Sequence, residues 1–151
     1  MIARLFGLLL IVGTLLGCAS AEPEPTTVEL IVTASEDLNP GSAGEPLPVI
    51  VRLYRMSASQ RFERAAYGQI YDDDSKALGG DLVGVVEFLF FPGQSETIER
   101  VFLPNERFLG VLVAFRDPDT AKWRSVVAVP PNRQSRFVLH IDRRGASLRR
   151  A

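Results

Sequence analysis

The sequence has very few of the side chains on which most catalytic and metal sites depend. Its 151 residues include one cysteine, one histidine and one tryptophan. A zinc site needs three or four histidine, cysteine or acidic ligands, and nucleophilic catalysis needs a nucleophile, a base and an orienting group. A single cysteine also excludes an internal disulfide. We therefore expect no metal site, no cofactor, no small-molecule substrate and no enzymatic activity.

The net charge of the chain is also close to zero. The chain carries 17 lysines and arginines against 18 aspartates and glutamates, a formal charge of −1. Proteins that bind nucleic acid are typically basic, so we expect no nucleic-acid partner. Acidic residues are frequent between Glu22 and Glu45, and arginines between Arg133 and Arg150. We interpret these as two solvated faces; a patch that steers a partner is the alternative.

The two features nearest to a chemical site have structural interpretations. His140 lies in the alternating segment Phe137 to Ile141, where it falls on the polar face. The run Asp72-Asp73-Asp74 lacks the alternating ligand spacing and the distal glutamate of an EF-hand loop. We expect it at the N-terminal end of a short helical turn, where the helix dipole favours acidic side chains. A cell-wall hydrolase would have to use these same carboxylates, and we consider that function improbable.

The chain begins with the parts of an export signal. Arg4 precedes an almost unbroken apolar stretch from Leu5 to Leu16, which is shorter than the roughly 20 residues of a membrane span. The stretch ends in Gly17-Cys18, which resembles the lipobox of bacterial lipoproteins. That resemblance implies removal of residues 1–17 and acylation of Cys18. Since Ala19 replaces the aspartate that retains lipoproteins in the inner membrane, it also implies an outer-membrane anchor facing the periplasm. The alternative is an ordinary secretory signal with a chance cysteine.

The mature chain divides into a tether and one domain. Residues 18–27 contain Pro23 and Pro25 and show no apolar periodicity, so we expect a semi-extended tether that spans about 20–30 Å at roughly 3.1 Å per residue. Residues 28–151 have the length of a single domain.

Short alternating segments bounded by turn residues predict a mainly β fold. The strands are expected at Thr27 to Thr33, Val49 to Met56, Val85 to Phe91, Glu96 to Leu103, Leu109 to Phe115, Trp123 to Val129, Phe137 to Ile141 and Ala146 to Arg150. Seven or eight such strands favour a β-sandwich. Val85 to Phe91 is apolar on both faces except at Glu87, which predicts a central strand.

One segment has a helical period. Phe62, Ala65, Ala66 and Ile70 lie at helical spacing, and Ser57 or Ser59 could cap the start. A second short turn is expected over Asp73 to Leu78. We therefore predict a small helical insertion at about 57–79, between two strands of the sandwich.

The connection from Ser35 to Pro48 is long for a compact domain, in which most connections have about 4–6 residues. Its first half, Asp37-Leu38-Asn39-Pro40-Gly41, places turn formers around one apolar residue. An ordered loop tip that presents Leu38 between polar neighbours would suit protein recognition. A solvated hairpin excursion explains the same residues equally well.

Taken together, the motifs resemble those of the type VI secretion lipoprotein family, TssJ. They are the lipobox at Cys18, Leu38-Asn39-Pro40, Pro48-Val49-Ile50-Val51-Arg52-Leu53-Tyr54, Phe62, Tyr71, Leu78-Gly79, Asp81, Phe91-Pro92-Gly93, Gly110 to Asp117 and Trp123-Arg124. The resemblance implies a transthyretin-like sandwich with a helical insertion. We interpret Trp123 and Phe115 as core residues, with a partner site as the alternative, and expect Tyr54 and Tyr71 to pack between insertion and sheet.

The resemblance also implies a function. Members of this family bind the C-terminal periplasmic domain of TssM, the inner-membrane anchor of the apparatus, through the loop between the first two strands. The corresponding residues here are Glu36, Asp37, Leu38, Asn39 and Pro40. We expect replacement of Leu38 or Asn39 to weaken binding and leave thermal unfolding nearly unchanged. The alternative is a periplasmic carrier or chaperone, which should contain an apolar cavity.

Overall fold

The computed structural model describes residues 22–151. Cys18 and the expected leader lie outside the described residues. Residues 22–25 are exposed, have no regular secondary structure, and lead directly into the first strand. In the described part of the chain, no helix is long and apolar enough to cross a membrane.

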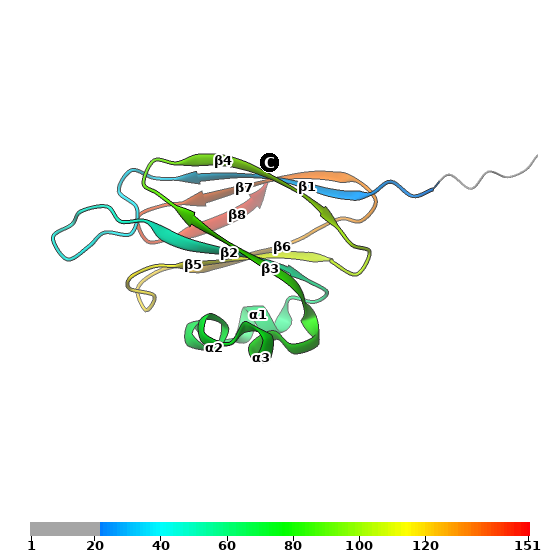
Figure 1. Ribbon diagram of the computed structural model, residues 1–151, viewed down its shortest axis with the longest axis horizontal. Coiled ribbons are helices and arrows are strands. Elements are labelled where there is room, and N and C mark those ends of the chain that lie inside the picture. The colour runs from blue at the N-terminus through cyan, green and yellow to red at the C-terminus, as the bar shows by residue number, and fades with distance from the viewer. Residues whose placement is uncertain (1–21) are drawn as a thin grey trace, which may run out of the picture.

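Eight strands form two four-stranded sheets packed face to face (Figure 1). The strands are β1 (Thr26–Ala34), β2 (Val49–Met56), β3 (Leu82–Phe90), β4 (Ser95–Phe102), β5 (Phe108–Ala114), β6 (Arg124–Ala128), β7 (Gln134–Ile141) and β8 (Ala146–Arg150). One sheet has the order β4-β1-β7-β8 and the other β3-β2-β5-β6. Neighbours are antiparallel except β1 and β7, which are parallel. The predicted transthyretin-like sandwich is confirmed.

The main core lies between the sheets and follows from alternation along each strand. In β1, Val28, Leu30 and Val32 are buried, while the residues between them face outward and are half-buried. Successive side chains of a strand point to opposite faces, so one sequence period builds one apolar layer. Phe115 joins this core as expected, and Trp123 packs against it while partly buried.

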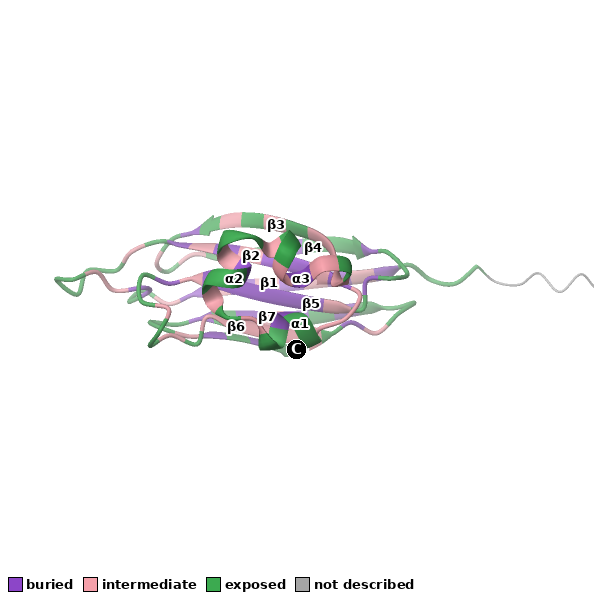
Figure 2. Cartoon of the chain, turned by 90° about the horizontal axis from the view of Figure 1, so that it is seen from below, coloured by how far each residue is buried: buried purple, intermediate pink, exposed green. Residues whose placement is uncertain are grey.

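The helical insertion covers the outer face of the sheet β3-β2-β5-β6 (Figure 2). It comprises α1 (Gln60–Arg64), α2 (Tyr67–Asp72), α3 (Asp74–Leu78) and the 3₁₀ turn η1 (Gly79–Asp81). The expected periodic segment is two helices, because the backbone is extended at Ala65 and Ala66. A second core is buried between helices and sheet, formed by Tyr54, Met56, Phe62, Ile70, Leu78 and Leu112. Tyr71 packs on its margin, so both tyrosines lie between insertion and sheet as expected.

Two arginines of the sheet hold these short helices in place. Helices of five or six residues are unstable alone, because too few hydrogen bonds repay the cost of starting a helix. Arg124 Nη1 donates to the carbonyl oxygens of Phe62 at 2.9 Å and Ala65 at 2.6 Å, at the end of α1. Arg52 Nη1 donates to the carbonyl of Tyr71 at 2.9 Å, near the end of α2. Each arginine thus satisfies carbonyls that a helix end leaves unpaired.

The prediction that β3 is a central strand is wrong: β3 is an edge strand of its sheet. The inner face of β3 covers the main core, where Phe90 is fully buried. Its outer face is apolar without being covered, because the helices lie beside it and leave Val85 and Leu89 exposed. The apolar residues on both faces of β3 therefore mark an edge strand whose outer face is exposed.

Candidate functional site: the loop end opposite the tether

The connection between β1 and β2, residues 35–48, projects from one end of the sandwich (Figure 1). The N-terminal residues 22–25 leave from the other end, since β1 runs the length of the molecule between the two. Three further turns lie at the same end as the loop: β3–β4, β5–β6 and β7–β8. Hydrogen bonds join them to the loop, which makes this end a continuous surface.

Leu38 is not presented at the loop tip, so that expectation is wrong. Its side chain is 0 % exposed and belongs to the main core between the sheets. Its carbonyl accepts a hydrogen bond from the N–H of Leu47 at 2.9 Å, which folds the loop back over it. Leu38, the single apolar residue among the turn formers, therefore packs into the core and orders the loop.

Asn39 is also buried, at 6 % exposure, and joins its own loop to the β5–β6 and β7–β8 turns. Its side chain donates to the carbonyl of Pro48 at 3.0 Å and accepts from the N–H of Arg116 at 2.8 Å. Its own N–H donates to the carbonyl of Arg143 at 3.1 Å. The φ angle of 46° lies in the left-handed region, which asparagine tolerates better than most residues. Replacing Asn39 must therefore perturb stability, contrary to the expectation that unfolding would be unchanged.

The exposed residues of the expected binding set are Glu36 and Asp37, and Pro40 is half-buried. Asp37 Oδ2 lies 3.9 Å from Arg143 Nη1, a loose and exposed ion pair. Pairs of this kind stabilise a fold by about 0–1 kcal/mol. The carboxylates of Glu36 and Asp37 are therefore available to a partner.

Phe91 was missed as a candidate, although it lies beside the loop. It is 53 % exposed at the end of β3. The β3–β4 turn is held to the loop by the N–H of Gly93, which donates to the Ser35 carbonyl at 3.2 Å. Pro92-Gly93 predicts only a turn. The signal for a candidate binding residue was the large aromatic side chain directly before that turn. We call Glu36, Asp37, Pro40 and Phe91 the distal surface.

Comparison with known proteins identifies the family. Residues 26–144 match the family described as type VI secretion lipoprotein, VasD, EvfM, TssJ. The chain belongs to this family. A search of curated proteins found no significant match.

Solved structures of type VI secretion lipoproteins share the fold. The lipoprotein TssJ1 from Pseudomonas aeruginosa is 37% identical, with a TM-score of 0.81, over 84% of this chain and 97% of that one. Lip from Serratia marcescens, described as a membrane-bound component of the type VI secretion system, is 20% identical, with a TM-score of 0.75, over 84% and 96%. A chain of a structure described as a type VI membrane complex is 26% identical, with a TM-score of 0.73, over 83% and 99%.

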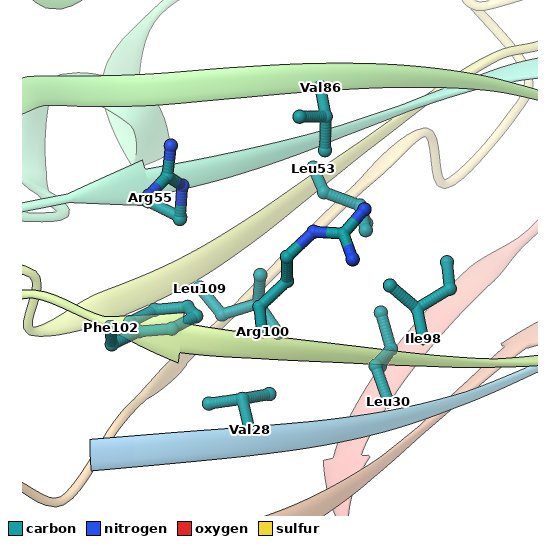
Figure 3. Close-up of a pocket in the computed structure, with 9 residues that line it drawn as sticks. All are labelled: Val28, Leu30, Leu53, Arg55, Val86, Ile98, Arg100, Phe102 and Leu109. Carbon is teal, nitrogen blue, oxygen red and sulfur yellow. The ribbon is translucent and has the colours of Figure 1, made fainter. Parts of the chain in front are cut away.

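The hollows of this type VI secretion lipoprotein do not suit a carrier of apolar ligands. A cavity of about 20 Å³ opens between β3 and β4 and is lined by side chains of both sheets (Figure 3). Ligand sites typically have about 300–1,000 Å³. A larger open hollow, about 300 Å³, lies on the helical insertion and is lined mainly by polar side chains, among them Arg61 and Arg64. The alternative function as a carrier therefore gains no support.

The titratable residues considered from the sequence have structural partners. Asp73 is the N-cap of α3, and its carboxylate accepts from the N–H of Lys76 at 3.0 Å, which confirms its expected place at a helix start. His140 lies on the exposed face, with Nδ1 3.0 Å from Thr33 Oγ1. Burial raises the pKa of Tyr54 to about 12. Within residues 22–151, no three His, Cys, Asp or Glu residues gather as a metal site would require.

Proposed function

We propose that this type VI secretion lipoprotein docks the envelope-spanning secretion complex to the outer membrane. Acyl chains on Cys18 anchor it in that membrane, facing the periplasm. The distal surface binds the C-terminal periplasmic domain of TssM, and through it the inner-membrane complex. The role is mechanical and needs neither a cofactor nor catalysis.

The observation that carries the proposal is the placement of the tether and the distal surface at opposite ends of the sandwich. The nine residues of β1 separate them, and a strand rises about 3.3 Å per residue, or roughly 30 Å here. A tether of about 20–30 Å adds to this. The molecule thus holds its distal surface about 50 Å from an anchor at Cys18, directed away from the membrane.

The composition of the distal surface fits a protein partner. Phe91 supplies an exposed aromatic side chain, and aromatic residues are enriched where protein interfaces concentrate their binding energy. Glu36 and Asp37 flank it with carboxylates that favour a basic patch on the partner. Leu38 and Asn39, buried beneath, give the loop a fixed shape, so little conformational entropy is lost on binding.

The relatives support the same partner class. TssJ1, at 37% identity, and a chain of a type VI membrane complex, at 26%, share this fold over more than four fifths of the chain. The proposal transfers membership of a membrane complex from them to this chain. Within that complex, we propose TssM as the direct contact.

Cell fractionation combined with a secretion assay separates the two halves of the proposal. Cys18→Ser should release the protein from the outer membrane and abolish type VI secretion, because acyl chains contribute about 0.8 kcal/mol per buried methylene to anchoring. Asp37→Arg should remain in the outer membrane and still lose secretion. Glu99→Arg, exposed on the outer face of the other sheet, is the matched control and should secrete normally.

Normal secretion by Cys18→Ser would contradict the anchor. Normal secretion by a variant that combines Asp37→Arg with Phe91→Asp would contradict the assignment of the distal surface as the binding site.

A further inference from the structure

The edge strand β3 lacks the usual protection against pairing with another chain. Natural edge strands are commonly short or interrupted by charges or proline. β4 carries Glu96, Glu99 and Arg100, and β6 has only five residues. β3 has nine residues, no proline and one charged residue, Glu87, whose carboxylate accepts from Arg52 Nε at 2.8 Å. Its outward backbone groups are therefore an unblocked template for a strand.

The opposite side of the sandwich shows how a closed edge looks in this fold. There, backbone hydrogen bonds join the two sheets: the N–H of Lys122 donates to the Arg144 carbonyl, and the N–H of Ala146 donates to the Lys122 carbonyl, both at 2.8 Å. On the β3–β4 side, the hydrogen bonds found within residues 22–151 lie at the two ends. At one end they join Phe91 and Gln94 in the turn, and at the other the Glu106 carboxylate accepts from Arg55 Nη1 and from the N–H of Leu103, both at 2.8 Å. The middle of this side is open.

Exposed apolar side chains are concentrated on this open side. All the large exposed hydrophobic residues of the described chain lie on β3 or β4 or directly after them: Val85, Leu89, Phe91, Val101 and Leu103. Val85 and Leu89 share the outer face of β3, since they are separated by an even number of residues, and Phe91 directly follows the strand. The register shift opposite Arg55 and Met56 limits the regular edge to residues 84–90.

A free positive charge lies beside the same edge. Arg100 extends from β4 across the cavity toward β3, with its guanidinium carbon 6.0 Å from the centre of the Phe88 ring (Figure 3). Its Nη1 donates to the carbonyl of Glu99 at 2.7 Å, and no carboxylate within residues 22–151 lies within salt-bridge distance of it. Arg100 is exposed, and a strand placed along β3 could satisfy it with a carboxylate through a charge-assisted hydrogen bond.

We propose that the β3 edge at residues 84–90 receives an extended strand from the same partner that the distal surface binds. This rests on the proposed function. The strand carries apolar residues at alternate positions, which cover Val85 and Leu89, and an acidic residue that reaches Arg100. Strand addition of this kind draws affinity from main-chain hydrogen bonds and specificity from alternate side chains.

Two features favour the partner over a second copy of this chain. Phe91 directly follows β3 and also belongs to the distal surface, so a bound partner meets the edge without a gap. Antiparallel pairing, the commoner arrangement, would join two copies of β3 with their tethers at opposite ends. In that arrangement the distal surface of one copy would be directed toward the membrane, which disagrees with the proposed function.

Binding and hydrogen exchange of soluble proteins test the inference. Both sheets and both cores lie within residues 26–150, so a mature chain starting at residue 18 with Cys18→Ser retains the whole folded unit. The probe is the TssM C-terminal periplasmic domain. Leu89→Lys should weaken binding about tenfold or more, because it places a charge on the edge that the strand covers. Ser147→Lys, at an exposed position of β8, is the matched control and should bind normally.

Amide exchange of residues 84–90 should slow on binding, while that of β8 stays unchanged. Full affinity of Leu89→Lys with unchanged exchange at 84–90, while the wild type binds, would overturn this inference alone. Absence of wild-type binding would overturn the proposed function and this inference with it. Concentration-dependent dimers that Leu89→Lys abolishes, with partner binding unaffected, would assign the edge to a second copy and overturn the partner assignment.

Discussion

Asn39→Ala should destabilise the domain substantially, although the residue lies in a loop. The substitution removes the hydrogen bond to the Pro48 carbonyl and the one from the Arg116 N–H. Leaving a buried partner unsatisfied costs about 1–3 kcal/mol for each bond, less where water reaches the exposed group. Alanine in the left-handed region at φ 46° costs about 1 kcal/mol more. We expect a total loss of about 3–5 kcal/mol from the free energy of unfolding.

Asn39→Gly separates the two contributions, because glycine adopts positive φ freely but makes no side-chain hydrogen bonds. It should therefore lie about 1 kcal/mol above Asn39→Ala in stability and well below the wild type. Urea unfolding of the soluble domain measures all three proteins. An Asn39→Ala variant within about 0.5 kcal/mol of the wild type, the range of ordinary surface substitutions, would refute the assignment of Asn39 as the residue that orders the loop.

Three further predictions concern the second core and the helical insertion. Gly110→Val should lower the free energy of unfolding by about 1–3 kcal/mol through overpacking, because a Cβ there would lie 3.2 Å from the Phe62 ring. Gly80→Val, with open space around it, is the control and should stay near the wild type in a urea titration. Arg124→Met should keep the packing of the stem but release the carbonyls at the end of α1, so the amides of α1 should exchange faster while those of β7 do not change. Stability should fall as pH rises from about 10 to 12, by about 2–3 kcal/mol at most, because unfolded Tyr54 loses its proton in that range while the buried phenol keeps it. Tyr54→Phe should remove this part of the slope, and equal slopes for the two proteins would contradict it.

The strands could be predicted from the sequence because each buried face repeats with a period of two. β1 and β2 show this best, with one buried side chain at nearly every second position. The insertion could be located for the same reason at the helical period, but its break at Ala65 and Ala66 could not. At this break the Ala65 carbonyl accepts from Arg124 of the sheet, and such a tertiary contact leaves no local signal.

Two errors have a common physical origin. Leu38 was expected at a loop tip and β3 in the centre of a sheet, because hydrophobicity alone does not say whether a residue is covered. Leu38 is covered by the core of the sandwich, which its local turn formers conceal. Val85 and Leu89 are uncovered because the helices lie beside β3. Burial in these cases is decided by the packing of distant elements.

Calorimetric titration of the soluble mature chain with the TssM C-terminal periplasmic domain measures whether the distal surface binds TssM. We expect saturable binding that Asp37→Arg weakens while the free energy of unfolding changes by no more than about 1 kcal/mol, since that side chain is exposed and its ion pair with Arg143 is loose. Absence of binding between well-folded proteins, or unchanged affinity of Asp37→Arg combined with Phe91→Asp, would contradict it.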